Sequence, residues 1–477
     1  MSQQGTAMNL SLNQALQAAM QNINAGNVGP AQNILNQILA KMPSHPDARH
    51  LLGVTYLMQQ QFDLAEKEIK KSLQKNPKFA MAHYNMGNVL LGKNLPDKAI
   101  VSFKKALKLK PDYKDAKRRL ADAQYVAEKF EDAEETYRAI LVETPQDVSL
   151  MISLADMLDT QGKRDAAIVL YRQATTIMPN EVVLYVKLAN TLIQNGQQKE
   201  AEKAVQKAKE LKPDLYAVHM ADAYVQLSQS KAKEGLKAAD KALELFPGET
   251  TALAWKITAL DQLGGGQEYD RYMNFDDFVR AEWVDVPEGY KDIDAFNEAL
   301  VKHVVNHPKL FEFEHYEVTR YGKEVKDIYS EPMGPVKHLK AAMEKHVANY
   351  IATLPDDPEN QFVATAPKKW RIKSWANVLA GPGRQIAHIH GEAWMSGCYY
   401  VRMPDITKSE DNPTHAGYIE FGQINDEFPN LKTDRLKFIQ PKEGLVALFP
   451  SYLYHATVPT ESQQPRIAIA FDVVPVK

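Results

Sequence analysis

The first half of the chain repeats one pattern of small, bulky and polar positions every 34 residues. Its most regular member is a proline, found at Pro43, Pro77, Pro111, Pro145, Pro179, Pro213 and Pro247. A small residue stands 24 positions before each proline, at Ala19, Gly53, Gly87, Ala121, Ala155, Ala189 and Ala223. Another stands 12 positions before it, at Ala31, Ala65, Ala99, Ala133, Ala167, Ala201 and Gly235. Two fixed small positions predict two antiparallel helices in close contact, and the proline ends the second helix because its ring blocks the next hydrogen bond.

Other positions support the same helix pair. A bulky ring stands eight residues before three of the prolines, at Phe103, Tyr137 and Tyr171. Residues 249–263 have the amphipathic spacing of one further helix, which we expect to cap the stack. Period and pattern together resemble the tetratricopeptide repeat over roughly residues 11–247. The resemblance implies a right-handed superhelix of helix pairs, with a groove that receives a peptide or protein segment.

The pattern changes at Gly264-Gly265-Gly266, which predicts a linker. Helical periodicity returns over residues 293–306 and 336–354, and from about Trp370 apolar residues alternate with a period of two. The expected strands cover residues 373–379, 385–390, 395–403, 445–449 and 466–474. Glycines and prolines separate these strands, as is typical of a sandwich or barrel.

These patterns predict an α+β multidomain chain in three parts. Residues 1–263 form a helical solenoid of about seven repeats with a capping helix. Residues 264–369 form a linker with supporting helices, and residues 370–477 form a β-barrel core.

Composition restricts the chain to the class of ordinary globular proteins. Hydrophobic residues make up 44% and charged residues 25% of the 477 residues, and the formal net charge is −3. This balance excludes a disordered chain and lacks the basic surplus of a nucleic-acid binder. Cys398 is the only cysteine, so the chain forms no internal disulfide. No apolar run approaches the ~18–20 residues that span a membrane, so we expect no membrane segment.

The N-terminal segment is unusual in its lack of charge. Residues 1–40 contain no charged side chain, and the first basic residue is Lys41. A secretory signal begins with positive charge, so we expect none here and place the protein in the cytoplasm. Terminal repeats are commonly atypical, which favours a poorly charged cap. A contact between copies of the chain is the alternative, and the oligomeric state stays open.

Three histidines follow a pattern typical of a metal site. His388 and His390 are two residues apart in an expected strand, so both rings project from the same face. His455 comes 65 residues after His390 and can complete the set from an opposite strand. Eleven residues further, Arg466 opens a strand in which two alanines share its face. A fixed guanidinium above small residues suits a carboxylate, which it can bind through two hydrogen bonds.

Several blocks occur in a specific order along this part of the chain. They are Ser374-Trp375-Ala376-Asn377-Val378-Leu379, His388-Ile389-His390, Ser396-Gly397-Cys398-Tyr399-Tyr400-Val401, Phe449-Pro450-Ser451, and then His455 and Arg466. Together they resemble a bacterial and phage family of 2-oxoglutarate/Fe(II)-dependent oxygenases, over roughly residues 370–474. The resemblance implies a double-stranded β-helix (jelly roll) with helices on its outer face. It also implies a reaction that uses O2 and 2-oxoglutarate, releases CO2 and succinate, and leaves a hydroxyl group on the substrate.

The resemblance further implies roles for individual residues. His388, His390 and His455 would hold Fe(II). Arg466 would bind the far carboxylate of 2-oxoglutarate, helped by a hydroxyl group. The remaining candidates for this cofactor pocket are Tyr400, Ser396 and, more weakly, Asn377.

The metal ligands depart from the usual pattern of the wider oxygenase superfamily. That superfamily binds iron through two histidines and a carboxylate, with His-x-Asp or His-x-Glu as the first pair. Here the pair is His388-x-His390, so we expect three imidazole ligands, with the carboxylate of Glu392 as the alternative third ligand.

The expected function is hydroxylation of a protein or peptide that the repeats recruit, because a repeat groove beside an oxygenase would raise the local concentration of its target. One alternative is a cupin-like metal enzyme that does not use 2-oxoglutarate. A second is a non-catalytic scaffold for protein interactions.

Overall fold

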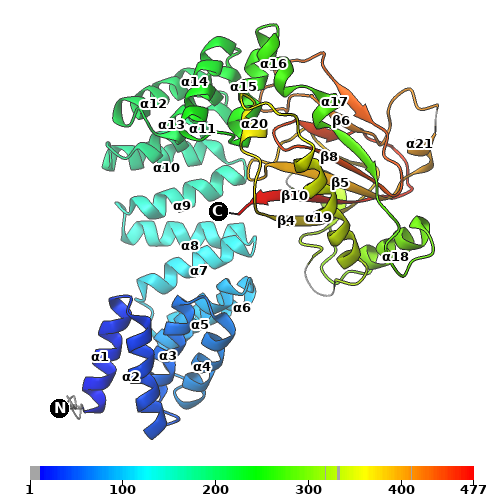
Figure 1. Cartoon of the computed structure of the whole chain (residues 1–477). Coiled ribbons are helices and arrows are strands. Elements are labelled where there is room, and N and C mark those ends of the chain that lie inside the picture. The colour runs from blue at the N-terminus through cyan, green and yellow to red at the C-terminus, as the bar shows by residue number, and fades with distance from the viewer. Residues whose placement is uncertain (1–10, 317, 330–332, 410, 477) are drawn as a thin grey trace, which may run out of the picture. The chain divides into compact units, whose positions relative to one another are not determined.

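The computed structural model describes residues 11–316, 318–329, 333–409 and 411–476 (Figure 1). Residues 1–10 of the uncharged N-terminal segment therefore lie outside the described residues. The chain divides into two compact units, Met1–Pro179 and Asn180–Lys477. This division does not test the domain boundaries expected at residues 263 and 369, which stay predictions. None of the described helices combines the length and apolar character needed to cross a bilayer.

The described residues of the first unit form five helix pairs. Their helices are α1 (Leu12–Asn24), α2 (Val28–Lys41), α3 (Pro46–Met58), α4 (Phe62–Lys75), α5 (Ala80–Gly92), α6 (Pro96–Leu109), α7 (Lys114–Val126), α8 (Phe130–Glu143), α9 (Val148–Thr160) and α10 (Arg164–Ile177). The second unit begins with α11 (Val182–Gln194), α12 (Gln198–Leu211), α13 (Tyr216–Ser228), α14 (Ala232–Leu245) and α15 (Thr250–Gln262). The predicted helix pairs and a further helix at the predicted place are thus confirmed, whereas its capping role stays a prediction.

The small positions of the repeat lie where the two helices of a pair meet. The alanines at both positions are buried, and a side-chain carbon added at Gly87 would stand 2.4 Å from the ring of Phe103. Phe103, Tyr137 and Tyr171 are themselves buried within their repeats. The Phe103 ring therefore fills the space that Gly87 leaves on the partner helix.

Helices and three strands follow the linker glycines, all three of which have positive φ. The elements up to the barrel are α16 (Gln267–Tyr272), α17 (Phe275–Phe278), β1 (Arg280–Trp283), α18 (Ile293–Val305), β2 (Phe311–Tyr316), β3 (Thr319–Val325), α19 (Val336–Ala352) and α20 (Gln361–Ala364). Those of the barrel are β4 (Trp370–Gln385), β5 (Met395–Arg402), α21 (Asp405–Lys408), β6 (Ile419–Phe421), β7 (Lys437–Ile439), β8 (Leu445–Pro450), β9 (His455–Thr457) and β10 (Arg466–Pro475).

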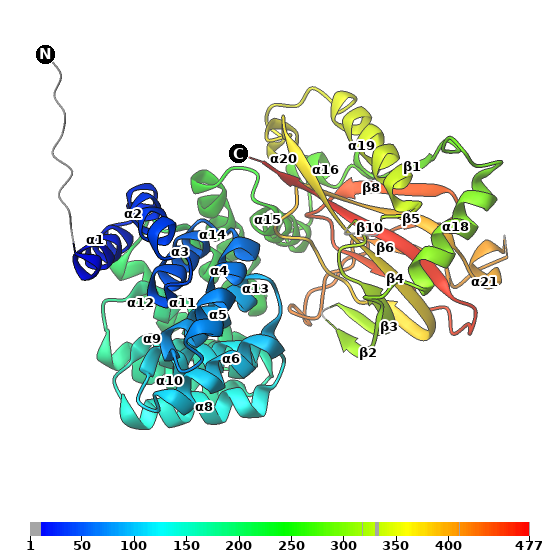
Figure 2. The same ribbon diagram turned by 90° about the horizontal axis from the view of Figure 1, so that it is seen from below.

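The strands form two antiparallel sheets of a jelly roll. The larger sheet has the order β1-β8-β5-β10-β4-β3-β2, and the smaller has the order β7-β6-β9. Helices α18 and α19 pack on the larger sheet, and their apolar residues join its core (Figure 2). Strand β10 lies at the centre of that sheet, between β4 and β5. Residues at alternate positions of β10 therefore point into the barrel.

One predicted strand is wrong. Residues 385–390 do not form a strand of their own, because β4 runs through Gly381, Pro382 and Gly383 as far as Gln385. A register shift in the pairing with β3, between Arg320 and Gly322, accommodates this segment. Beyond β4, only an isolated bridge joins His388 to His455.

The last helices of the solenoid contact the barrel within the second unit. The Thr250 hydroxyl at the start of α15 donates to the Ala393 carbonyl at 2.6 Å. Phe428, in the segment between β6 and β7, packs its ring edge against Tyr224 of α13 and Trp255 of α15. Ala393 is three residues after His390, so this junction supports the segment that carries a predicted metal ligand.

Candidate metal centre

The structure brings the three predicted histidines together. Each of His388, His390 and His455 offers one ring nitrogen, and these atoms lie within 4.8 Å of one another. Backbone hydrogen bonds hold the segments in place: His388 and His455 exchange a pair at 3.1 and 3.0 Å. The amide of His390 donates to the Ser451 carbonyl at 3.3 Å. The cluster is therefore positioned by the main chain rather than by the rings alone.

The hydrogen bonds of the rings determine which nitrogen is available to a metal. Nδ1 of His388 lies 2.7 Å from the Ile386 carbonyl, and Nδ1 of His455 lies 3.0 Å from the Leu453 carbonyl. A carbonyl only accepts, so both Nδ1 atoms carry the proton and both Nε2 atoms keep a lone pair. Nε2 of His390 is buried with no hydrogen-bond partner among the described residues. These are the features of rings prepared to bind a cation.

Burial keeps two of these rings neutral. Desolvation, with a smaller effect of the neighbouring His390, lowers the pKa of His388 to about 3. Desolvation also lowers the pKa of His455 well below its usual value, and the other two histidines add to this effect. Neutral imidazole is the form that binds metal, so neither ring must release a proton when a metal enters.

Asp472, for which the sequence predicts no role, lies beside His390. Its carboxylate accepts a hydrogen bond from Nδ1 of His390 at 2.9 Å and another from the Ser396 hydroxyl at 2.7 Å. The Ser396 hydroxyl also lies 2.7 Å from that of Ser451. The sequence does contain one indication of a role for Asp472, because this residue shares a strand face with Arg466. It does not reveal which histidine ring a carboxylate 82 residues away will contact.

A narrow cavity inside the barrel joins the three histidines to Arg466. The Arg466 side chain is buried, and its Nε has no hydrogen-bond partner among the described residues. The hydroxyl of Tyr400 is likewise buried and unpartnered there, and the guanidinium lies 5.5 Å from the centre of the Tyr400 ring. Burial raises the pKa of the nearby Cys398 thiol, which keeps it uncharged. A buried cation with an unused donor is an incomplete site that an anionic group would satisfy.

The other predicted residues have different positions. Ser396 lines the cavity, but its hydroxyl is bonded to Asp472 and Ser451. Asn377 is buried outside the cavity lining, and with its amide oriented to donate to Glu324 and accept from the Trp375 indole the distances are 3.2 and 3.3 Å. The alternative ligand Glu392 lies outside the histidine cluster: its side chain is 81% exposed and accepts from Lys373 at 2.6 Å.

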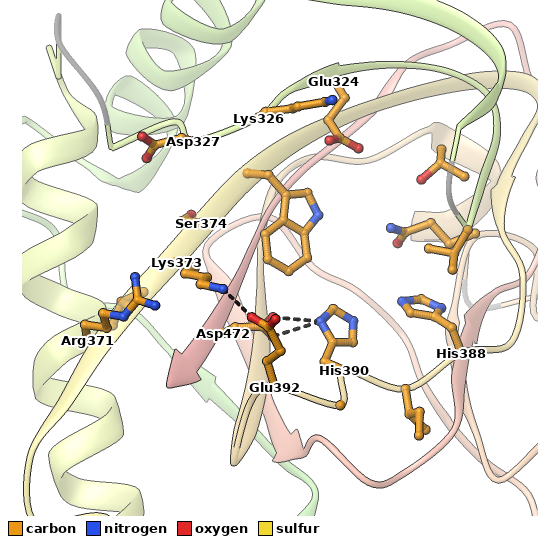
Figure 3. Close-up of a pocket in the computed structure, with 17 residues that line it drawn as sticks. Glu324, Lys326, Asp327, Arg371, Lys373, Ser374, His388, His390, Glu392 and Asp472 are labelled. Atoms are coloured by element: carbon orange, nitrogen blue, oxygen red, sulfur yellow. Dashed lines mark hydrogen bonds and ion pairs between the residues drawn. The ribbon is translucent and has the colours of Figure 1, made fainter. Parts of the chain in front are cut away.

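A wider pocket of about 740 Å³, the outer pocket, opens beside His388 and His390 (Figure 3). The Trp375 ring forms one wall and stacks on His390, with centroids 5.4 Å apart and planes 20° apart. Acidic and basic side chains line the rest, including Glu324, Asp327, Arg371 and Lys373. The pocket therefore offers a substrate both a flat apolar wall and charged groups of either sign.

Comparison with known protein families agrees with this geometry. Residues 373–472 match the family described as "Putative 2OG-Fe(II) oxygenase". Residues 22–88, 90–157 and 160–223 match the tetratricopeptide repeat. The chain fuses tetratricopeptide repeats to a 2OG-Fe(II) oxygenase domain. All three clustered histidines, Arg466 and Asp472 lie within the oxygenase match.

Solved structures similar to this fusion protein include two tetratricopeptide repeat proteins. The C-terminal part of one from Cytophaga hutchinsonii is 19% identical, with 50% of this chain and 98% of that chain covered and a TM-score of 0.43. One from Parabacteroides merdae is 16% identical, with 52% and 98% covered and a TM-score of 0.40. No curated protein matches the chain significantly.

Proposed function

We propose that this fusion protein is a 2-oxoglutarate- and Fe(II)-dependent dioxygenase that hydroxylates a protein or peptide side chain. The observation that carries the proposal is one cavity containing both the histidine cluster and a buried arginine with an unused donor. When bound, Fe(II) with 2-oxoglutarate activates O2, so that one oxygen atom enters the substrate C–H bond and the other enters succinate as CO2 leaves.

The residues present fit such a cofactor pair. His388, His390 and His455 would hold Fe(II) through Nε2, because hydrogen bonds engage each Nδ1. Arg466 would bind the far carboxylate of 2-oxoglutarate, and the Tyr400 hydroxyl would donate to the same group. Both donors are buried, so water does not compete for them. Ser396 and Asn377 would then support the pocket rather than contact 2-oxoglutarate, and Glu392 would stay outside the ligand set.

The outer pocket would hold the substrate. It borders two of the three histidines and includes the Trp375 wall, so a side chain entering it would approach the metal position. The repeats would recruit the protein that carries this side chain and so raise its concentration near the pocket.

The absorption spectrum of the full-length protein with Fe(II) and 2-oxoglutarate, recorded without oxygen, tests the proposal. We expect the weak visible charge-transfer band that 2-oxoglutarate gives when it chelates Fe(II) through two oxygens. His455→Ala should lose both the metal and the band. Arg466→Ala should keep the metal but need at least ~10-fold more 2-oxoglutarate, because a charged hydrogen bond is worth about 1.5–3 kcal/mol.

Two other outcomes would contradict the proposal. Stoichiometric metal with no band at any 2-oxoglutarate concentration would favour the cupin-like alternative, which three imidazole ligands also suit. A protein that binds neither Fe(II) nor 2-oxoglutarate would be a scaffold. Far-ultraviolet circular dichroism of both variants would show that their losses do not come from misfolding.

A further inference from the structure

His390 differs from the other two clustered histidines in the group that its Nδ1 contacts. His388 and His455 donate to neutral backbone carbonyls two residues before them in the chain. His390 donates to the carboxylate of Asp472 at 2.9 Å. Figure 3 shows this carboxylate facing the imidazole from β10. One of the three rings is therefore paired with a negative charge.

That negative charge is not compensated by another side chain. Among the described residues, His390 is the one group in ion-pair distance of Asp472. Lys373 stands opposite Asp472 in the register of β4 and β10, but its Nζ forms an ion pair with Glu392 at 2.6 Å. The side chains of His390 and Asp472 are each only 13% exposed, so water screens their interaction weakly. Nδ1 of His390 lies 2.9 Å from both carboxylate oxygens, and Ser396 fixes the carboxylate by donating to one of them, Oδ1, at 2.7 Å.

We propose that Asp472 supplies, through His390, the negative charge that a carboxylate ligand brings directly in the usual oxygenase site. The inference rests on the proposed function, because it requires a metal on the histidines. A carboxylate behind a ligating imidazole makes the ring a stronger donor and fixes its orientation. Three imidazoles alone would leave the full +2 charge on the metal. Asp472 is thus a positioning residue that reduces this charge by polarising His390.

Asp472→Asn separates the charge from the hydrogen bonds. The asparagine oxygen can still accept from His390, and its NH2 can donate to Ser396. The Ser396 and Ser451 hydroxyls, 2.7 Å apart, can reverse their direction because either can be the donor. The variant therefore keeps the network and removes the charge.

The measurements are the Fe(II) dissociation constant of the full-length protein and the energy of the charge-transfer band with 2-oxoglutarate. We expect Asp472→Asn to bind Fe(II) ~10–100-fold more weakly. We also expect its band at shorter wavelength, since a less electron-rich Fe(II) gives up an electron less readily. Glu392→Gln is the matched control, because it removes one negative charge two residues from His390, on an exposed side chain already paired with Lys373. Its Fe(II) affinity and band should be those of the wild type.

Two results would overturn the inference. Wild-type affinity and band energy in Asp472→Asn would mean that only the hydrogen bond matters. A loss as complete as in His390→Ala would mean that the ring has adopted the wrong tautomer, so that Asp472 orients His390 and its charge contributes little. If the wild type itself binds no Fe(II), the proposed function fails and the inference falls with it, whereas failure in the variant alone leaves the function standing.

Discussion

At the scale of single residues, burial gives the same neutral charge state to histidines with different surroundings. His50, in α3, is 1% exposed, and desolvation lowers its pKa to about 4. Its Nε2 accepts from the Asn85 amide at 2.8 Å, and its ring packs edge-on against Phe79. His388 is also buried and neutral, but it faces two other imidazoles. A low pKa alone therefore does not indicate a metal ligand.

His50 makes the stability of its repeat dependent on pH. In the unfolded chain a histidine titrates near 6.5, whereas the folded ring takes up a proton only near pH 4. Between these values the unfolded state binds more protons, so stability is full above pH 6.5 and falls as the pH drops towards 4. The loss is on the order of 2–3 kcal/mol. Hydrogen exchange of α3–α5 amides, corrected for intrinsic rates, should show this loss in the wild type.

His50→Gln should remove most of this pH dependence, because it removes the titrating group. His83→Gln is the control, since this ring lies in the next repeat and contacts the Pro77 carbonyl at the surface. An unchanged pH dependence in His50→Gln would contradict the assignment to His50.

The candidate site could be predicted in part from its residues. The alternation on β10 is local, and local periodicity is visible in a sequence. The hydrogen-bond partner of each Nδ1 is not visible in the sequence, because it depends on how distant strands align. Asp472 meets His390 only after β10 has paired with β5 in the register that sets Asp472 opposite Ser396.

At the scale of elements, the repeat helices could be predicted almost completely, because the 34-residue period fixes both helices and their contact. Gly87 shows how close this contact is, since an added side-chain carbon would stand 2.4 Å from Phe103. Gly87→Ala should therefore destabilise the repeat by about 1–2 kcal/mol, as overpacking outweighs the gain of about 1 kcal/mol in helix propensity. Hydrogen exchange in α5 and α6 would measure the effect.

Gly29→Ala is the matched control for Gly87→Ala. Gly29 also lies in a repeat helix, α2, but no atom lies within 4 Å of the added carbon. This variant should be as stable as the wild type or slightly more stable. Equal effects of the two substitutions on stability would show that close packing at Gly87 does not destabilise the alanine variant.

The strands were harder to predict than the helices. Glycine and proline at residues 381–383 indicate an end, yet β4 continues through them because β3 pairs on both sides of its register shift. That pairing is a tertiary contact, and it overrides the local preference of the residues. The same limit applies to the segment of His388 and His390, whose position depends on the bridge to His455 and on the hydrogen bond to Ser451.

At the scale of the whole molecule, the solenoid and the oxygenase domain share a hydrogen-bonded junction within the second unit. Thr250→Val keeps the shape of the side chain but removes the hydroxyl that donates to the buried Ala393 carbonyl. The cost should be about 1–2 kcal/mol. All five tryptophans, Trp255, Trp283, Trp370, Trp375 and Trp394, lie in the second unit, so denaturant unfolding followed by tryptophan fluorescence reports on this unit.

Thr250→Ser is the matched control for the junction, because it keeps the donor and loses only a methyl group. It should retain most of the stability that Thr250→Val loses. Equal losses in the two variants would assign the effect to packing of the methyl group instead of the hydrogen bond.

The junction also determines where this protein can be cut and recombined. Tyr224 and Trp255 belong to the solenoid by sequence, yet their rings, which stack on each other, pack against Phe428 of the oxygenase domain. Helices α13 and α15 therefore pack against the barrel and support it, although their sequences repeat the pattern of the helices before them. A chimera that exchanges the repeats should therefore be joined before α13. The repeats before α13 can then vary in number while the oxygenase domain keeps the two helices against which it packs.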